Sequence, residues 1–461
     1  MGIIIGKIKK LSPAAKIALS FLIMILIGSV LLALPISQTS FSEATYFDHL
    51  FMATSMVCVT GLFSVPIAST YSFFGQVISL GLIQIGGLGL MTLLAALVMS
   101  IGKKMSYANT IAVQEALNRE KMGDFKPYLI SIVLYTALFE GIGTLLLLTH
   151  FVPEFGWDRG FFMSLFLAVS AFCNAGFDLF GAGSLQEYVH QPVVNLVVGS
   201  LIVLGGIGFP VWFDLSNNFR SLFKSKRRIR TKSFFRRLQV HSRLALTMSF
   251  ILVVTGIILF LLVEWNNSVT IGDFTFGEKL LTAFFETVTM RSGGFTTIDL
   301  ANMRPFTLLY FILNMFIGGS PGGTAGGVKT TTLALLVLLI YNDVRGQKNI
   351  NYHYHTIAIA TVRKAIVVIG AFFVFLVLGA GLLFLFEPDK EPLRLLFETV
   401  AAFSTGASIN LTTELSWMSQ VVLMVIMFVG RIGPITIFLS LERKNREVTD
   451  VKYATTNILI G

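Results

Sequence analysis

Long apolar runs separated by short charged segments make up most of the chain. A helix needs about 20 consecutive apolar residues to cross a bilayer. Eight runs approach or exceed that length, two of them with one internal cation each, and they lie at 17–34, 73–99, 129–152, 193–213, 244–263, 306–340, 365–386 and 418–441. This pattern predicts an all-α membrane protein with eight spans.

Four shorter apolar stretches lie between these runs, near 49–59, 161–173, 280–290 and 395–403. They are too short to span, and their length is typical of helices that enter the membrane from one side and turn back. Each leads into a glycine turn, and the turn glycines are Gly61, Gly176, Gly294 and Gly406. The spacings between these glycines are 115, 118 and 112 residues, close to a quarter of the chain.

The regular spacing predicts four helix–pore-loop–helix repeats in a pseudo-fourfold arrangement around one central pore. The repeats would be 1–110; 111–242, with a basic cytoplasmic segment; 243–360, with a broken membrane helix; and 361–461, with a cytoplasmic C-terminal tail. Carbonyl oxygens of four turns that face one axis can replace the water shell of a monovalent cation, as in a potassium selectivity filter. The turn residues are Val59, Thr60, Gly61, Asn174, Ala175, Gly176, Ser292, Gly293, Gly294, Ser404, Thr405 and Gly406.

Composition and charge fit a membrane protein and predict its orientation. Hydrophobic residues make up 54% of the chain and charged residues 13%, which excludes a soluble enzyme and a disordered scaffold. The net charge of +10 does not point to nucleic acid, because Lys and Arg gather in 1–16, 101–127, 214–244, 341–364 and the tail from 441. The positive-inside rule then places both termini in the cytoplasm. The opposite face is acidic and would attract cations, although outer segments that merely lack Lys and Arg would look similar.

The sequence contains no catalytic constellation and is not predicted to be an enzyme. Its two cysteines, Cys58 and Cys173, are too few for a disulfide framework or a structural zinc site. No Gly-x-Gly-x-x-Gly unit follows a strand, so the sequence predicts no dinucleotide site in this chain. No cofactor is expected in this chain, and K⁺ at the filter is the only metal expected.

Three motifs carry a likeness to a known family. They are Val57-Cys58-Val59-Thr60-Gly61-Leu62, the glycine-rich stretch 319–330, and Gly430-Arg431-Ile432-Gly433-Pro434. On these motifs the whole chain resembles the Trk/Ktr/HKT superfamily of potassium transporters, and most closely the KtrB-like membrane subunits. The resemblance implies a filter glycine in each turn, and Gly61 implies a preference for potassium over sodium. The family's fourth turn has a residue between its Thr and Gly, whereas Thr405 adjoins Gly406 here.

The broken stretch in the third repeat has two interpretations. Its glycines and its proline cannot hold a stable helix, at about 1 kcal/mol per Gly and about 3 kcal/mol for Pro. The resemblance implies an intramembrane gating loop, and a passive kink is the alternative. It also implies that Arg431 faces the pore as an electrostatic barrier, with a tie to a carboxylate as the alternative. The gating-loop residues are Gly318, Gly319, Ser320, Pro321, Gly322, Gly323, Thr324, Ala325, Gly326 and Gly327.

The resemblance further implies an assembly in the bacterial plasma membrane. Such subunits form homodimers on a cytoplasmic ring of RCK-type nucleotide-binding proteins, which would carry ATP or ADP, and Na⁺ stimulates them. The basic segment 220–243 would lie on anionic lipid and would also help to dock that ring.

Isolated charges in apolar stretches are first interpreted as structural. Glu286 and Glu398 each follow a Phe and precede Thr-Val, and we expect them to brace the turns rather than bind permeant ions. Arg291 is a candidate partner for Glu286. Glu140 is expected to form a helix–helix hydrogen bond, and binding of a coupling ion is the alternative.

Two other functions fit less well. An ion-coupled symporter for another small solute would have inverted repeats and a midplane pocket, whereas these repeats run in the same sense. A membrane enzyme that acts on lipid or isoprenoid phosphate would need Asp, His or Arg clustered at one membrane face.

Overall fold

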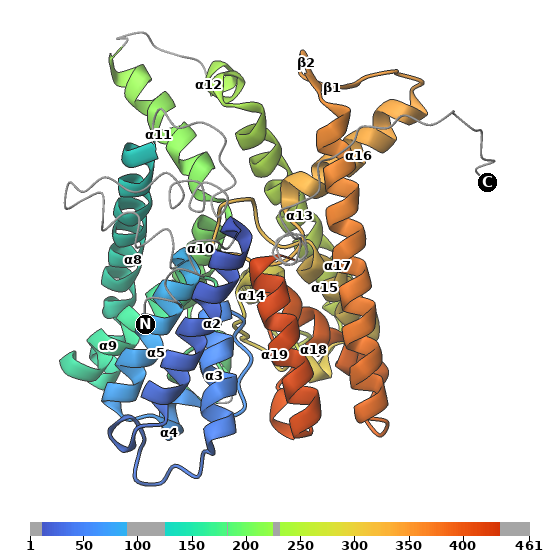
Figure 1. Ribbon diagram of the computed structural model, residues 1–461. Helices are drawn as coiled ribbons and strands as arrows, with labels where there is room; N and C mark the ends of the chain where they lie inside the picture. Colours follow the sequence, from blue (N-terminus) through green and yellow to red (C-terminus); the bar gives the residue numbers. More distant parts are fainter. Residues whose placement is uncertain (1–11, 90–124, 182, 225–230, 434–461) are drawn as a thin grey trace, which may run out of the picture.

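The computed structural model describes residues 12–89, 125–181, 183–224 and 231–433, and most of them are helical (Figure 1). The predicted boundary at 110, most of the basic segments 1–16 and 101–127, and the C-terminal tail lie outside the described residues. One order of elements, namely a long helix, a short helix, a loop and a second helix, recurs four times. The elements are α2 (Pro13–Leu32), α3 (Tyr46–Cys58) and α5 (Phe73–Leu88); α8 (Phe125–Phe155), α9 (Trp157–Phe172) and α10 (Pro192–Gly206); α13 (Val240–Glu264), α14 (Phe276–Ser292) and α15 (Pro305–Phe316); α17 (Ile359–Phe386), α18 (Pro392–Ser404) and α19 (Trp417–Ile432).

The remaining elements connect these helices. α11 and α12 and the antiparallel strands β1 and β2 lie at the same end of the molecule, at the top of Figure 1. Their bounds and those of the other connecting elements are α4 (Ile67–Thr70), α11 (Phe209–Lys224), α12 (Thr231–Arg237), α16 (Thr330–Val344), β1 (Ile350–Tyr352), β2 (His355–Ile357) and four 3₁₀ turns at Pro35–Ser37, Gln186–Tyr188, Leu300–Asn302 and Thr412–Glu414.

The first helix of each set is long enough to cross a membrane. Among the described residues four helices meet that criterion by length and composition, at Ala14–Leu32, Pro127–Phe155, Val240–Glu264 and Ile359–Phe386. A fifth span results if α10 and the start of α11 count as one broken helix, since they meet at 93°. Large apolar side chains on the long helices are exposed, Phe250 by 70%, as expected of a lipid-facing surface.

The second helix of each set is shorter than the apolar run that predicted it, and one predicted span, at 193–213, has to be corrected. An unbroken helix over 193–213 is wrong, because α10 ends at Gly206 and α11 begins at Phe209 after Gly208, whose φ is 97°. The predicted break within 306–340 is confirmed, since α15 ends at residue 316 and α16 begins at residue 330. α5 and α19 also end before positive-φ glycines, and the described residues stop close to both ends.

The short helices begin three or four residues earlier than their apolar stretches predict. α3 begins at residue 46 and α14 at residue 276, where the sequence is polar. Both starts are capping boxes: the Thr45 hydroxyl accepts from the Asp48 amide while Asp48 accepts from Thr45, and Thr275 and Glu278 do the same. The residues just before these two apolar stretches therefore form the first turn of each helix and do not belong to the preceding loop.

Two buried or half-buried carboxylates each tie the end of a first helix to the start of the second helix of the same set. Glu264, at the end of α13, accepts hydrogen bonds from the Arg304 amide (3.0 Å) and the Thr307 hydroxyl at the start of α15. Glu387, at the end of α17, accepts from the amide of Ser416 (2.7 Å) and the hydroxyl of Ser419 (2.8 Å) at the start of α19. In both sets a carboxylate thus satisfies the free amides of a helix N-terminus.

Replacing Glu264 should destabilise the fold. Glu264 is fully buried and also accepts from Asn267 and Thr270, so Glu264→Ala leaves several buried donors unpaired. We expect a loss of at least about 2 kcal/mol in unfolding free energy. Thermal unfolding in detergent measures the loss, with Asp273→Ala at an exposed acid as the matched control. Equal melting temperatures for the two variants would contradict this account.

Candidate functional site

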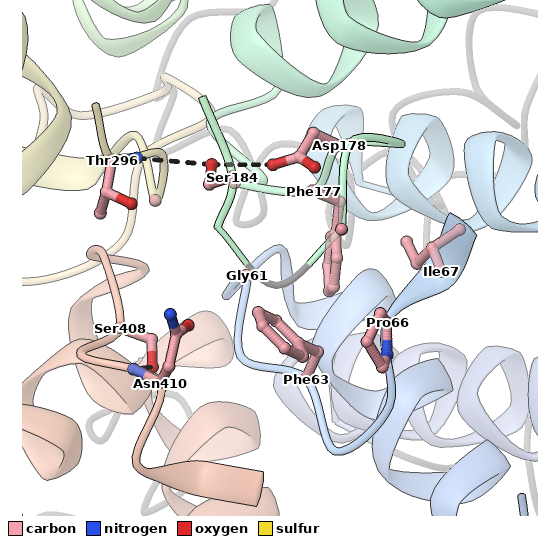
Figure 2. Close-up of a pocket in the computed structure, with 13 residues that line it drawn as sticks. Gly61, Phe63, Pro66, Ile67, Phe177, Asp178, Ser184, Thr296, Ser408 and Asn410 are labelled. Atoms are coloured by element: carbon pink, nitrogen blue, oxygen red, sulfur yellow. Dashed lines mark hydrogen bonds between the residues drawn. The ribbon is translucent and has the colours of Figure 1, made fainter. Parts of the chain in front are cut away.

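Loops from all four sets line one cavity, which Figure 2 shows. The cavity has a volume of about 30 Å³, enough for about two water molecules. Gly61, Gly176 and Gly294 line it from the first three sets, and Ser408 and Asn410 line it from the fourth. The sequence-predicted turns therefore meet at one place, apart from the glycine of the fourth.

The three lining glycines are in direct backbone contact and have left-handed conformations. Their φ angles are 79° at Gly61, 71° at Gly176 and 84° at Gly294. A Cβ atom at Gly176 would lie 2.6 Å from Cα of Gly294, and one at Gly61 would lie 2.8 Å from the carbonyl oxygen of Ala175. Any side chain would be strained and would push the turns apart.

The fourth turn has a different register. Left-handed residues stand two positions before Gly61 and Gly176, namely Val59 and Asn174, and the left-handed Thr405 stands two positions before Ala407. Gly406 itself has no positive φ, and a Cβ there would meet the side chain of Met315. By its distance from the left-handed residue, Ala407 occupies the place that glycine holds in the first two turns, although its own φ is not positive.

The remaining predicted turn residues are buried around this contact. Ser292 and Ser404 are the last residues of α14 and α18, and Gly293 follows with a φ of −94°. Thr60 bonds to Ser55 within its own set, at 3.0 Å between hydroxyl oxygens.

Buried carboxylates brace the third and fourth turns, as expected from the sequence. Glu286 Oε1 accepts from the amide and the hydroxyl of Thr297, both at 2.8 Å. Glu398 accepts from Ser408 Oγ at 2.7 Å, from the Thr412 amide at 3.1 Å and from the Thr412 hydroxyl. These bonds join each short helix to the chain that returns from its turn.

The suggested pairing of Arg291 with Glu286 is wrong. Arg291 Nη2 donates to Ser249 Oγ on α13 at 3.3 Å, and no ion pair joins it to Glu286. The expected helix–helix hydrogen bond of Glu140 is confirmed, since Gln84 Nε2 on α5 donates to Glu140 Oε2 on α8 at 3.3 Å. Five residues, about 1.4 helical turns, separate Arg291 from Glu286, so the two side chains leave α14 toward different neighbours.

The glycine-rich loop 318–327 packs into the bend between α10 and α11. Ser320 N donates to the carbonyl of Gly206 at 2.9 Å, and Thr324 N donates to that of Gly205 at 3.3 Å. The loop also reaches the turns, because Gly326 N donates to Thr405 Oγ1 at 2.9 Å. The helix break at 205–210, which contains glycines and a proline, positions the loop. A Gly-Gly-x-Gly sequence occurs at this break and also at 86–89, where α5 ends. This motif could have revealed both helix ends, which the run of apolar residues does not indicate.

Arg431 joins the end of α5 to the glycine-rich loop. Its Nη2 donates to the carbonyls of Gly86 (2.5 Å) and Gly87 (2.9 Å), and its Nη1 donates to the carbonyl of Thr324 (2.5 Å). No carboxylate of the described residues pairs with it. Lys329 donates to one carbonyl, that of Ala325, at 2.7 Å.

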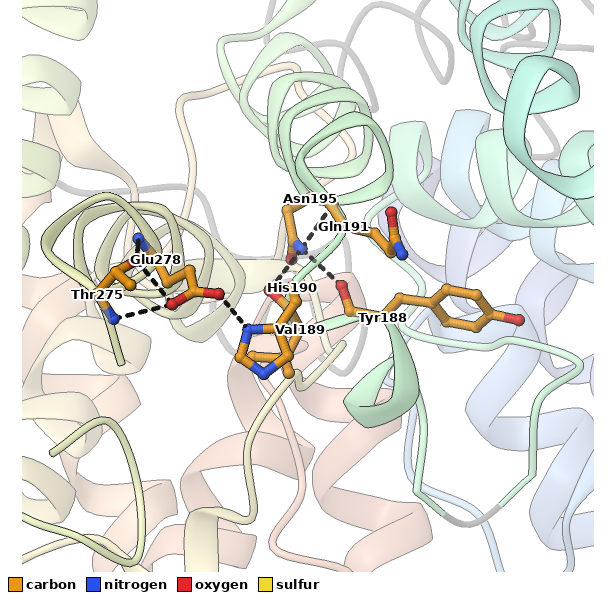
Figure 3. Close-up of polar contacts among 7 residues, drawn as sticks. All are labelled: Tyr188, Val189, His190, Gln191, Asn195, Thr275 and Glu278. Atoms are coloured by element: carbon orange, nitrogen blue, oxygen red, sulfur yellow. Dashed lines mark hydrogen bonds and ion pairs between the residues drawn. The ribbon is translucent and has the colours of Figure 1, made fainter. Parts of the chain in front are cut away.

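Polar side chains form part of the cavity lining. Asp178 lines the cavity and accepts from the Phe180 amide (2.9 Å) and the Ser184 hydroxyl (2.8 Å). Burial raises the pKa of the Asp178 carboxyl to about 6, against the opposing effect of these hydrogen bonds. Figure 3 shows a further polar contact, in which His190, before α10, points toward Glu278 on α14 at 2.8 Å. No cluster of three or more metal-ligating side chains exists among the described residues.

A model of the TrkH family, described as a cation transport protein, matches residues 11–446 of the chain. The chain belongs to the TrkH family. It is 36% identical over 456 residues to the Ktr system potassium uptake protein B of Bacillus subtilis, covering 98% of this chain and 97% of that protein. It is also 36% identical over 458 residues to the potassium/sodium uptake protein NtpJ of Enterococcus hirae, covering 98% of both chains.

The fold agrees with that assignment. The crystal structure of the potassium transporter TrkH from Vibrio parahaemolyticus superposes with a TM-score of 0.71 at 17% identity, covering 92% of this chain and 84% of that one. The chain is therefore a helical membrane protein of a transporter family rather than an enzyme, and the resemblance on its three motifs is confirmed.

Alanine should distinguish the turn glycines. Gly176→Ala and Gly294→Ala place a methyl group against backbone at positive φ, with a conformational cost of about 1–2 kcal/mol before any clash. Gly406→Ala meets chiefly the flexible side chain of Met315. We expect cation uptake to be abolished by the first two changes and largely kept by the third. Cation uptake is measured in cells that hold equal amounts of each variant in the membrane. An equal loss of uptake in all three variants would contradict the register of the fourth turn.

Proposed function

We propose that the chain is the ion-conducting membrane subunit of a potassium uptake system. The observation that carries the proposal is the contact of three left-handed glycine turns from successive sets around one cavity. Four helix–pore-loop–helix repeats would then surround a single pore in pseudo-fourfold arrangement. Relatives of the same length are potassium or potassium/sodium uptake proteins by name, which supports potassium as the cation.

Conduction would use backbone carbonyls rather than charged side chains. A potassium ion would lose water in the filter and exchange it for the carbonyl oxygens of the turns. The loop 318–327, held against α10 and the fourth turn, would block the path below the filter and act as the gate. Arg431 would add a positive barrier at the same level, and opening would require its bond to Thr324 to break.

Regulation would come from other chains. We propose a homodimer on a cytoplasmic ring of RCK-type subunits that bind ATP or ADP, with Na⁺ as an activator. The name of the Bacillus relative, a Ktr system protein, supports a multi-subunit system. The basic residues of α11, α12 and the start of α13, Arg220, Arg236, Arg237 and Arg243, support a cytoplasmic position for that end and both termini, in the bacterial plasma membrane.

Flux measurements on proteoliposomes test the proposal. At fixed potential, the purified chain with its regulatory ring should take up K⁺ and Rb⁺ in preference to Na⁺ and Li⁺. Gly61→Ser should lower the K⁺/Na⁺ flux ratio by about tenfold or more, because a side chain enters the filter. Gly81→Ser is the matched control, since a Cβ at Gly81 meets no other atom within 4 Å. Uptake without discrimination among the four cations would refute the filter.

Uptake at low external K⁺ should depend on pH through Asp178. The raised pKa of about 6 means that the carboxyl is charged above pH 6 and becomes protonated as the pH falls below it. Loss of this charge at the cavity should reduce uptake about threefold, as expected for an attraction of under 1 kcal/mol. Asp178→Asn should remove this pH dependence and Asp158→Asn, at an exposed acid, should keep it. A pH profile that is identical in all three proteins would exclude Asp178 as its source.

A further inference from the structure

The side chain of Asn174 joins three segments that are far apart in the sequence. Its Nδ2 donates to Ser292 Oγ at 2.9 Å, at the end of α14, and its Oδ1 lies 3.0 Å from the hydroxyl oxygen of Thr324 in the glycine-rich loop. All three side chains are at most 2% exposed. A buried chain of hydrogen bonds thus runs from the loop through the second turn to the third.

Thr324 is the point at which the loop is most firmly held. Its amide donates to the carbonyl of Gly205, its carbonyl accepts from Arg431, and its hydroxyl also lies 3.0 Å from the carbonyl oxygen of Phe172. The hydroxyl therefore stays beside Asn174 only while the loop is seated. The single proton of this hydroxyl is shared between Asn174 Oδ1 and the Phe172 carbonyl, and departure of the loop would take it away from both.

The hydrogen bond of Asn174 spans the same two turns whose glycines touch. Asn174 stands two residues before Gly176, and Ser292 stands two residues before Gly294. The backbone of Asn174 is left-handed, with a φ of 58°, a conformation that Asn tolerates better than most residues. The second and third turns are thus joined by side chains at their base and by glycine backbone at the cavity.

We infer that Asn174 is a positioning residue through which the glycine-rich loop sets the shape of the filter. With the loop seated, Thr324 and Ser292 fix both ends of the Asn174 amide and hold the two turns in register. With the loop displaced, a buried carbonyl without a donor favours reorientation of the side chain, and the turns relax. Ion selectivity then depends on the state of the gate, an inference that rests on the proposed pore and gate.

Thr324→Val tests the link without altering a turn. The full-length chain, with its regulatory ring, is reconstituted and its K⁺ and Na⁺ fluxes are measured at fixed potential. Loss of one hydroxyl should lower the K⁺/Na⁺ ratio about threefold to tenfold, the effect of a single hydrogen bond, and Thr324→Ser should restore most of it. Thr144→Val is the control, because the Thr144 hydroxyl is also buried but bonds within α8, to the carbonyl of Glu140 at 2.7 Å.

Two results would overturn the inference. One is an equal change of K⁺ and Na⁺ flux in Thr324→Val, which would mean that the hydroxyl only holds the gate shut. The other is additivity of Thr324→Val and Ser292→Ala in the flux ratio, since two bonds that act through one amide should give a double variant little worse than either single one. A wild-type protein that does not discriminate K⁺ from Na⁺ would instead contradict the proposed filter, and the inference with it.

Discussion

The free carbonyl groups at the broken ends of the second helices govern the arrangement of the site. The last four carbonyls of a helix have no partner within it, and the membrane interior offers no water in their place. At the end of α5 these carbonyls accept from Arg431, and at the end of α10 they accept from amides of the glycine-rich loop. Satisfying two broken helices therefore brings the loop and the guanidinium together against the turns.

This constraint explains why the position of Arg431 suits arginine and not lysine. Three carbonyls, from Gly86, Gly87 and Thr324, accept from the two terminal nitrogens of one rigid, planar group. Lys329 lies near the same loop and satisfies a single carbonyl. Helix C-termini carry partial negative charge, so the half-buried cation is stabilised without a carboxylate. A single residue consequently holds both α5 and the loop.

The sequence predicted the helices and turns of the site better than the breaks within the helices. Apolar run length located every long helix, and the spacing of glycines located three turns that do meet, Gly61, Gly176 and Gly294. The prediction from apolar run length failed at 193–213, because hydropathy does not indicate the backbone freedom of Gly205, Gly206 and Gly208. The pairing of Arg291 was missed for a different reason, since a contact with Ser249 on another helix leaves no trace in local spacing.

In the proposed pore, the placement of two buried acids keeps their carboxylates away from the ion. Glu286 and Glu398 are fully buried behind the turns and bond to Thr297 and Thr412, and neither lines the cavity. The cavity is lined in the first three sets by Gly61, Gly176 and Gly294 together with side chains, among them Phe63, Asp178 and Thr296, and in the fourth set by Ser408 and Asn410. In the proposed filter, the close backbone contacts of the three glycines would set the distance between the turns, because any side chain at these positions would push the turns apart. The lining side chains would then be the part in which substitution tunes ion preference without separating the turns.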